Sequence, residues 1–388
     1  MTAPSDDARS AAPVDRASSA SGGDPAGGHA LWQGWGVTPG SKADAHVPNA
    51  LVTSLHRAAR VEDAVHGFVE ARLRRRGFRD TIVPYTGYGT SSWVRVLARL
   101  LLRRPEQPGS GRVPAVRGWR SFATLPVSAE TVVVEVGGRR HEVRTDRGGF
   151  IDAVVEAELE PGWRTVRLHR TGADPVEAPV RILAPDVRFA VVSDIDDTVM
   201  VTALPRPLLA AWNTFVLDEY ARSPVPGMAV LYDRLVTAHP TAPVFYLSTG
   251  AWNVAPALTR FLSRNLYPPG PLLLTDWGPT TDRWFRSGQA HKRATLERLA
   301  REFPDIRWLL VGDDGQHDQE IYGTFATSHP DNVAAVAIRQ LSPAQSVLAG
   351  GLSAHADGST AAVADGRLWI RAPDGAGLAR QLSEADLL

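Results

Sequence analysis

The chain has 388 residues, with 42 Lys and Arg against 42 Asp and Glu, and no cysteine. The balanced charge gives no reason to expect a nucleic-acid partner, and the lack of cysteine excludes disulfides, thiol catalysis and Cys-ligated zinc. The length suits two domains and a tail better than a single core.

The first segment, residues 1–29, is rich in Ala, Ser, Gly, Asp and Pro. It buries too little apolar surface to offset the entropy of ordering, so we expect a disordered tail. It also lacks the basic start and apolar stretch of a secretory signal. No apolar run in the chain is long enough to span a bilayer. We therefore expect a cytoplasmic protein, with peripheral membrane contact left open.

Helical spacing dominates the next region, residues 30–112. Apolar residues recur at helical intervals from Leu51, and Gly77 is a plausible stop. A second helix is predicted from Trp93 to Arg104, after a turn at Gly87 and Gly89, with Ser91 or Ser92 as its N-cap. Its leucines and arginines suit a helix packed on the protein, or one lying on an anionic membrane surface. A linker follows at 106–112.

The period changes to two in residues 113–184. VVVEV–GG–RRHEVRT predicts a hairpin that turns at Gly137–Gly138, and FIDAVVEAELE, WRTVRLHR and PVRILA predict further short strands. Strands this short and regularly spaced are typical of a small antiparallel β-sandwich.

Residues 187–340 alternate apolar runs with helical segments. The expected strands are FAVVS, VFYLS, PLLLT, RWLLV and VAAVAI. Helices are expected to begin near Leu208, Gly227, Asn253, His291 and Asp318. This alternation predicts a doubly wound parallel sheet. In the extension 341–388, GRLWIRAPDGAGLARQL predicts one more strand and a short helix.

Polar residues gather where these strands end, which is where ligands bind in such sheets. The first strand runs into Ser193-Asp194-Ile195-Asp196-Asp197-Thr198, and the second ends at Ser248-Thr249-Gly250. A helix is expected to open with His291-Lys292, and the fourth strand runs into Gly312-Asp313-Asp314-Gly315-Gln316-His317-Asp318. Each motif alone is weak, but their order on one βα framework is specific.

The chemistry of phosphate monoester hydrolysis needs these residue types. Asp194 and Asp313, at neighbouring strand ends, can bind one Mg²⁺ through oxygen. A carboxylate nucleophile would form an aspartyl-phosphate, and a second carboxyl two residues on, Asp196, can protonate the leaving oxygen and then activate water. Ser248 and Lys292 offer a hydroxyl and a fixed positive charge to the transferring group.

The motif DIDDT resembles the DxDxT signature of haloacid-dehalogenase phosphatases. More narrowly, SDIDDTV, VPGMAVLYDRL, FYLSTGAW, HKRATLERL and LVGDDGQHDQEIY resemble the catalytic domain of the actin-patch type of phosphatidate phosphatase, which is related to lipin. The resemblance covers about residues 187–340, and more weakly the upstream segment GYGTSSWVRVLARLLL. It implies a haloacid-dehalogenase-like α/β fold, with the β-rich segment and the N-terminal helices before it.

The resemblance also implies roles for single residues. Asp194 would be the nucleophile and a metal ligand, Asp196 the general acid/base with a metal-binding carbonyl, and Asp313 a direct metal ligand. Thr198 would close the first motif, and Ser248 and Lys292 would bind phosphoryl. Asp318 would complete the metal site as a ligand or behind one. Asp314 is the alternative to Asp318, and family relatives tend to carry a small residue at its position.

Several neighbours have plainer explanations. Asp197 is expected to cap the following helix, and His291 and His317 to be hydrogen-bonded or exposed rather than metal ligands. Trp252, Trp277, Trp284 and Phe285 could line a substrate pocket or belong to the core. Arg283 and Arg286 are expected in a solvated loop.

The sequence therefore predicts a Mg²⁺-dependent phosphatase that hydrolyses phosphatidate to diacylglycerol and phosphate. The segments 199–243 and 250–291 leave no room for a large cap domain, so an open site is expected, which suits a lipid headgroup. The alternatives are a phosphatase for a soluble phosphomonoester and a non-catalytic lipid- or protein-binding module. No sequence feature specifies an oligomeric state.

Overall fold

The computed structural model describes residues 67–104, 125–170, 175–201, 222–275, 281–315, 317–343, 345, 360–364 and 366–388, without the side chains of 281–287, 360, 363 and 364. All of them fall in one compact unit, Val61–Leu388. The predictions for the tail 1–29, for the helix before residue 67, for the linker 106–112 and for a helix near Leu208 lie outside these residues. So does that for Trp277. The prediction of a solvated loop at Arg283 and Arg286 is wrong, because both residues lie in a helix, α5 Thr281–Glu302. The side chains of Trp284 and Phe285 are among those not described.

The first described elements are a helix at 67–75 and a nine-stranded sheet. The helix ends before Gly77, whose φ of 83° is one that glycine adopts without strain, as predicted. The strands are β1 Arg79–Pro84, β2 Gly87–Thr90, β3 Trp93–Arg103, β4 Leu125–Pro126, β5 Thr131–Val136, β6 Arg139–Arg144, β7 Phe150–Glu156, β8 Gly162–His169 and β9 Val176–Leu183. Their order is β1-β3-β2-β9-β8-β5-β6, and β4 and β7 also pair with β3.

The prediction of a helix from Trp93 to Arg104 is wrong, because these residues form strand β3. The even-numbered positions carry a purely apolar and fully buried face: Val94, Val96, Ala98, Leu100 and Leu102. Arginines four residues apart on the other face fit a strand as well as a helix, since four residues are two repeats of a strand and close to one helical turn of about 3.6 residues. The segment is therefore neither a helix packed on the protein nor a helix on a membrane surface.

The predicted turn at Gly87 and Gly89 is also wrong, because both glycines lie within β2. They allow the backbones of β2 and β3 to approach each other closely, and they do not form a turn. A Cβ at Gly87 would lie 2.4 Å from the carbonyl oxygen of Arg95, and one at Gly89 would lie 2.1 Å from that of Trp93. The expected helical character of 30–112 thus fails for residues 79–103, and the sheet begins before residue 113.

The β-rich segment itself follows the sequence pattern. Strands β5 and β6 form the hairpin predicted at Gly137–Gly138, and both glycines have positive φ, at 55° and 76°. The strand pairs of this sheet are antiparallel among the described residues with one exception, β2 with β9, which run parallel. The expected antiparallel arrangement is therefore confirmed for most of the sheet.

A second sheet of seven strands follows, in the order β12-β11-β10-β13-β14-β16-β15. Its strands are β10 Phe189–Asp194, β11 Val244–Ala251, β12 Leu272–Thr275, β13 Arg307–Asp313, β14 Val333–Arg339, β15 Thr360–Ala364 and β16 Arg367–Ala372. All neighbours run parallel except β15 and β16. The five predicted strands and their parallel arrangement are confirmed.

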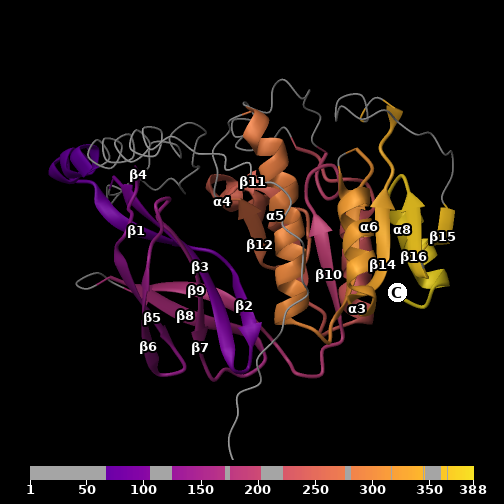
Figure 1. Ribbon diagram of the computed structural model, residues 1–388, viewed down its shortest axis with the longest axis horizontal. Helices are drawn as coiled ribbons and strands as arrows, with labels where there is room; N and C mark the ends of the chain where they lie inside the picture. The colour runs from indigo at the N-terminus through magenta and orange to yellow at the C-terminus, as the bar shows by residue number, and fades with distance from the viewer. Residues whose placement is uncertain are drawn as a thin grey trace, which may run out of the picture. The chain divides into compact units, whose positions relative to one another are not determined.

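Helices cover both faces of this sheet (Figure 1). They are α3 Met228–Ala238, η3 Trp252–Val254, α4 Ala255–Arg264, α5 Thr281–Glu302, α6 Asp318–Ser328, η4 Pro330–Asn332 and α8 Gly375–Glu384. Alternate residues of β10 point to opposite cores. Val191 packs with Leu231, Leu258 and Leu378 of α3, α4 and α8, and Val192 packs with Leu296 and Ile321 of α5 and α6. The predicted C-terminal strand and helix are β16 and α8.

One helix begins earlier than expected. The segment His291-Lys292 does not open a helix, because α5 already starts at Thr281. Gly288, three residues before this segment, lies within the helix and packs closely against strand β11. A Cβ at this position would lie 2.9 Å from Cγ2 of Thr249. Lys292 therefore projects from the middle of a long helix.

Candidate active site

The predicted motifs meet at the carboxyl ends of the central strands. Asp194 is the last residue of β10 and Asp313 the last of β13, and these strands are parallel neighbours. Asp318 is the first residue of α6, which follows β13. Parallel strands bring residues far apart in sequence to one edge of the sheet, and the next helix begins at that edge.

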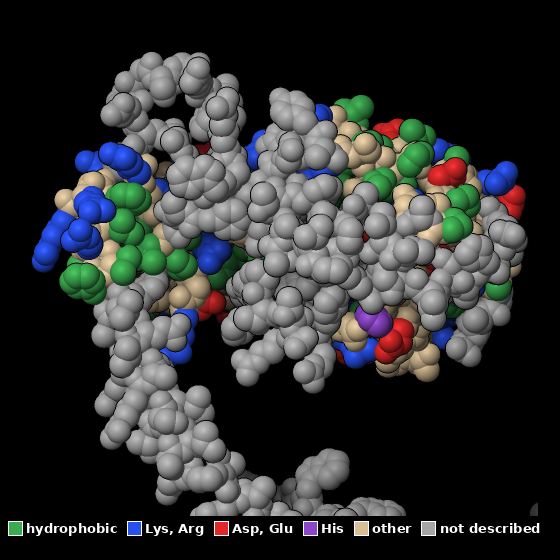
Figure 2. All heavy atoms as spheres, turned by 90° about the horizontal axis from the view of Figure 1, so that it is seen from above, with side chains coloured by type: hydrophobic (Ala, Val, Ile, Leu, Met, Phe, Trp, Pro, Cys, Tyr) green, Lys and Arg blue, Asp and Glu red, His purple; other side chains and the backbone are tan. Residues whose placement is uncertain are grey.

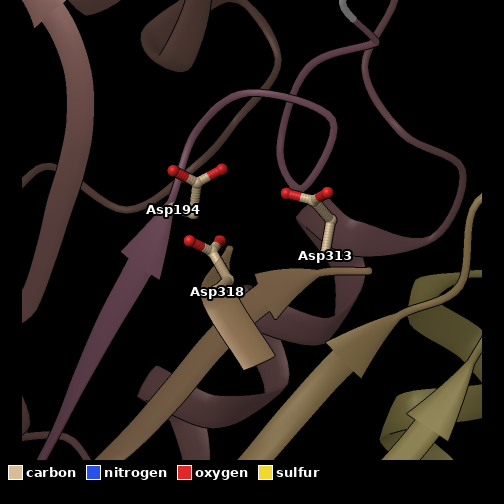
Figure 3. Close-up of side chains that lie close together, drawn as sticks. All are labelled: Asp194, Asp313 and Asp318. Carbon is tan, nitrogen blue, oxygen red and sulfur yellow. The ribbon is translucent and has the colours of Figure 1, made fainter. Parts of the chain in front are cut away.

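Three carboxylates face one another there (Figure 3). One oxygen each of Asp194, Asp313 and Asp318 lies within 4.8 Å of the others, and all three residues are buried. Oδ2 of each has no hydrogen-bond partner among the described residues. Buried polar atoms are rarely left without a partner unless an ion or water takes their place, so this arrangement fits a divalent cation held by oxygen ligands.

Lys292 supplies the positive charge inside this cluster. Its Nζ donates to Oδ1 of Asp194 at 2.7 Å and to Oδ1 of Asp318 at 2.5 Å, and its side chain is 3% exposed. Burial alone would lower the pKa of Lys292, but the carboxylates of Asp194 and Asp318 raise it above the usual value. The lysine therefore stays charged and fixes one oxygen of each carboxylate, which leaves the other oxygen of each for a cation.

This single lysine does not offset the burial of the acids and their mutual repulsion. Burial raises the pKa of Asp194 well above its usual value, and repulsion from Asp318, Asp196 and Asp313 adds to the rise, while Lys292 opposes it. Burial and then repulsion from Asp318 also raise the pKa of Asp313. A second positive charge at the site would relieve both effects.

Gly312 makes the approach of Asp318 possible. A Cβ at residue 312 would lie 2.7 Å from Oδ2 of Asp318 and 2.7 Å from Cε2 of Tyr322. Both contacts are shorter than packed atoms allow, so only glycine lets the carboxylate lie over the end of β13. No sequence pattern predicted this role for Gly312, although it stands directly before the acidic motif.

Asp196 occupies a different environment from the other acids. Its side chain is 4% exposed and does not belong to the three-carboxylate cluster. Ser248 Oγ donates to Oδ2 of Asp196 at 2.9 Å and accepts from the backbone N–H of Gly250 at 3.0 Å. The structure thus brings Ser248 to Asp196 and Lys292 to Asp194.

The turn after β10 is tight and buried. The N–H of Asp197 donates to the carbonyl of Met200 at 2.8 Å, and the N–H groups of Val199 and Met200 both donate to Ile195. Asp197 has a φ of 54° and caps no helix among the described residues, contrary to its predicted role. Thr198 is fully buried, and its Oγ1 has no hydrogen-bond partner in the described part of the chain.

The remaining predicted neighbours lie outside the cluster. Oδ1 of Asp314 accepts from the N–H of Leu341 at 2.8 Å. His291 lies 3.4 Å from the carbonyl of Leu273, and burial lowers its pKa to about 4. His317 is half-exposed and 3.6 Å from Glu320. Trp252 is buried in the core against Tyr85 and Phe150.

One contact of Asp194, the predicted nucleophile, was not predicted from the sequence. The hydroxyl of Tyr232 on α3 donates to Ser193 Oγ, which donates to the carbonyl of Asp194 at 2.6 Å. Tyr232 lies in the stretch VPGMAVLYDRL, so the motif was noted without its role. The fold and the site together define an α/β protein with a buried acid–lysine centre at the end of a parallel sheet.

Sequence comparison identifies the family of this part of the chain. Residues 189–340 match the family model described as the catalytic domain of phosphatidate phosphatase APP1. The chain is also similar to phosphatidate phosphatase APP1 of Saccharomyces cerevisiae, with 27% identity over 203 residues, 50% of this chain and 34% of the yeast protein. By sequence, residues 189–340 thus match the APP1 catalytic-domain family, as the motifs indicated.

A second relative covers a similar part. An uncharacterised protein of Schizosaccharomyces pombe is 26% identical over 154 residues, 39% of this chain and 25% of that protein. This chain spans about a third of the length of the budding-yeast relative and a quarter of the fission-yeast one. Among solved structures, a carbohydrate acetylesterase from Xanthomonas citri aligns over 70% of this chain and 73% of its own, at 9% identity and a TM-score of 0.26. A likeness this low supports no inference about fold or function.

Proposed function

We propose that the chain is a Mg²⁺-dependent phosphatidate phosphatase with a haloacid-dehalogenase-like catalytic domain. The observation that carries the proposal is the cluster of three buried carboxylates around Lys292, inside the segment that matches the APP1 catalytic domain. Oxygen-only ligands favour Mg²⁺ over zinc. Asp194, Asp313 and Asp318 would hold the ion, together with the backbone carbonyl of Asp196.

The proposed reaction proceeds in two steps on Asp194. An oxygen of its carboxylate bonds to phosphorus while the bond from phosphorus to the lipid oxygen breaks, and Asp196 gives its proton to that oxygen. Asp196 then takes a proton from water as the water oxygen attacks phosphorus, which releases phosphate and restores Asp194. A bound Mg²⁺ offsets the negative charge of the phosphate and the carboxylates.

The other residues act by position and charge. Lys292 holds Asp194 in place and adds a fixed positive charge beside the reacting group. Ser248, already bonded to Asp196, orients that carboxyl and offers its hydroxyl to a phosphate oxygen. Thr198 closes the motif with a buried hydroxyl. Tyr232 and Ser193 fix the backbone of Asp194.

The lipid substrate is supported by the family match and by an exposed surface at the N-terminal helix. No helix among the described residues is long and apolar enough to cross a membrane. On helix 67–75, Phe68 is 69% exposed and Val69 37% exposed. Exposed arginines surround them at positions 72, 75, 76 and 79. At the left of Figure 2, where this helix lies, Lys and Arg side chains stand beside apolar ones.

Such a surface suits peripheral contact of a cytoplasmic protein with an anionic membrane. Each Lys or Arg near such a surface contributes about 1 kcal/mol of binding, and Phe68 adds apolar burial. Flotation with vesicles of phosphatidylcholine and phosphatidate tests this contact. Binding should weaken in a Phe68→Ser, Arg75→Glu variant and persist in Val230→Ser, which removes an equally exposed apolar residue elsewhere. Equal binding by both variants would contradict the contact.

The experiment that tests the function is phosphate release from dioleoyl phosphatidate in detergent micelles with Mg²⁺. Wild type should release phosphate, Asp194→Asn should not, and Asp305→Asn, at an exposed position, should behave as wild type. Release from p-nitrophenyl phosphate but not from phosphatidate would indicate a soluble phosphomonoester as substrate. A folded wild type inactive on both substrates would leave the binding module as the explanation.

A further inference from the structure

A buried arginine outside the catalytic motifs reaches the turn that carries Asp196. Arg339 is the last residue of β14, the strand next to β13, and it is paired with Asp313 in register. Its side chain is 4% exposed. Its backbone carbonyl accepts from the N–H of Asp314 at 3.1 Å, so it also touches the start of the second acidic motif.

The guanidinium of Arg339 joins three segments at this edge of the sheet. NH1 donates to the carbonyl of Asp197 at 2.6 Å, Nε to the carbonyl of Pro373 at 3.3 Å, and NH2 to Oε1 of Gln345 at 2.8 Å. All three acceptors are neutral. In the described part of the chain no carboxylate lies within ion-pair distance of Arg339. Burial lowers the pKa of Arg339, and the more distant carboxylates of Asp197, Asp313, Asp314 and Asp374 oppose this effect. The direct hydrogen bonds of the guanidinium thus go to neutral groups, and they tie three segments together rather than forming a salt bridge.

The contact with Asp197 falls on the strained residue of the turn. Asp197 has a φ of 54°, in the left-handed region that side chains other than glycine rarely adopt. Strained residues of this kind persist where surrounding contacts hold them, and they cluster at active sites. Two hydrogen bonds hold this residue in place. Its carbonyl accepts from Arg339, and its N–H donates to the carbonyl of Met200.

Asp196 immediately precedes Asp197, the residue that these two hydrogen bonds hold. Asp194 lies on a paired strand end and needs no such support, because β10 is hydrogen-bonded on both sides. Asp196 lies beyond the strand, and its direction depends on the turn. A shift of about 1 Å in a catalytic group is enough to reduce a rate strongly.

We propose that Arg339 is a positioning residue, which clamps the carbonyl of Asp197 and thereby aims the carboxyl of Asp196 at the leaving oxygen. The proposal rests on the function proposed above. The planar fork of arginine is needed, because a lysine ammonium cannot reach the carbonyls of Asp197 and Pro373 and the amide of Gln345 together. Arg339 would touch neither substrate nor metal.

The test compares two substrates that differ in their need for a general acid. The leaving group of dihexanoyl phosphatidate is the alkoxide of a diacylglycerol, which must be protonated. The leaving group of p-nitrophenyl phosphate is p-nitrophenolate, which is stable without a proton. The value to compare is kcat/KM, since it reports the phosphoryl transfer to Asp194 and not the later hydrolysis. Arg339→Met and Arg339→Lys should both lower kcat/KM for the alkyl substrate about 10- to 100-fold, a part of what general acid catalysis contributes. The loss for p-nitrophenyl phosphate should stay within about threefold.

Control variants separate this role from general damage. Arg371→Met removes a half-buried arginine from the neighbouring strand β16. The guanidinium of Arg371 donates to Oε1 of Gln319 at 3.3 Å, and its loss should leave the substrate ratio unchanged. If the Arg339 variants do not fold, Gln345→Ala loosens the guanidinium without removing it and should give the same selective loss, smaller in size.

Three outcomes would overturn the proposal while leaving the phosphatase function intact. They are an equal loss for both substrates, full rescue by Arg339→Lys, and a loss confined to Mg²⁺ affinity. Failure of the proposed function is a different result, namely a folded wild type that hydrolyses neither substrate.

Discussion

Gly312 and Asp318 are in contact across the end of β13, at a distance that admits no side chain at residue 312. A Cβ there would lie 2.7 Å from Oδ2 of Asp318. We expect Gly312→Ala to displace Asp318 and to weaken Mg²⁺ binding about 10- to 100-fold, as changes behind metal ligands do. Isothermal titration with Mg²⁺ measures it.

Gly323→Ala is the matched control for this variant. Gly323 lies in α6, and an added Cβ would meet Trp369 at an ordinary 3.7 Å. That substitution should leave Mg²⁺ affinity unchanged and stabilise the helix by about 0.5–1 kcal/mol. Wild-type affinity in Gly312→Ala would show that Asp318 does not need its observed position.

The choice between Asp314 and Asp318 as metal support can be decided directly. Oδ1 of Asp314 is bonded to Leu341, whereas Asp318 contacts Lys292 and belongs to the acidic cluster. We expect Asp318→Asn to abolish phosphate release at millimolar Mg²⁺, and Asp314→Asn to keep most of it. The measurement is activity as a function of Mg²⁺ concentration, and the reverse ranking of the two variants would refute the assignment.

Stability should depend jointly on pH and Mg²⁺. The pKa of Asp194 and of Asp313 is raised by burial in the folded protein, so the folded metal-free chain binds more protons than the unfolded chain. Its stability is then lost as pH rises from the unfolded value of about 4 toward the raised values. Mg²⁺ needs the ionised carboxylates.

The rise in Tm caused by Mg²⁺ should therefore grow with pH between about 5 and 8, as measured by thermal unfolding with and without the ion. A variant with Asp194→Asn and Asp313→Asn should show little rise at any pH. A pH-independent rise in wild type would mean that these acids are not the ligands.

The C-terminal end of α5 is anchored by a polar network. NH2 of Arg95 on β3 lies 2.7 Å from Oε1 of Glu302, and the hydroxyl of Tyr88 donates to Oε2 at 2.9 Å. Both charged side chains are about 85% buried. Arg95→Met should cost about 3–5 kcal/mol in urea unfolding, because it leaves Glu302 buried without its partner.

The exposed pair Arg139–Glu158 serves as the comparison. Arg139→Met should cost less than about 1 kcal/mol, since both side chains of this pair lie in water. Similar costs for the two variants would show that the network around Glu302 adds no stability. The same measurement on Glu302→Gln tells how much of the effect comes from charge.

Much of the second sheet could be predicted because its signals are local. The apolar runs of β10 to β14 are short and separated by helical segments, and the acids follow directly at their ends. Strand β3 could not be assigned with the same rules. Its arginines at 95, 99 and 103 satisfy helical spacing, and only pairing with β1 and β7 decides for a strand.

The contacts of the site depend on tertiary structure in the same way. Motif order alone indicated Asp194, Asp313, Asp318 and Lys292. The need for Gly312, the bond from Ser248 to Asp196 and the reach of Arg339 to Asp197 depend on segments that the sequence keeps far apart. Gly288 is a further case. Glycine disfavours the interior of a helix, but Gly288 lies within α5 because its lack of a side chain allows close packing against Thr249.

The parallel sheet continues beyond the last residue of the family match. The match ends at 340, but β16 pairs with residues Ala335 to Arg339 of β14, and β15 pairs with β16 in turn. A shortened protein ending at 340 would expose the N–H and C=O groups of β14, whose residues are almost all apolar. Unprotected edges of this kind recruit strands from other molecules, so β16 and β15 keep the edge of β14 from pairing with another molecule.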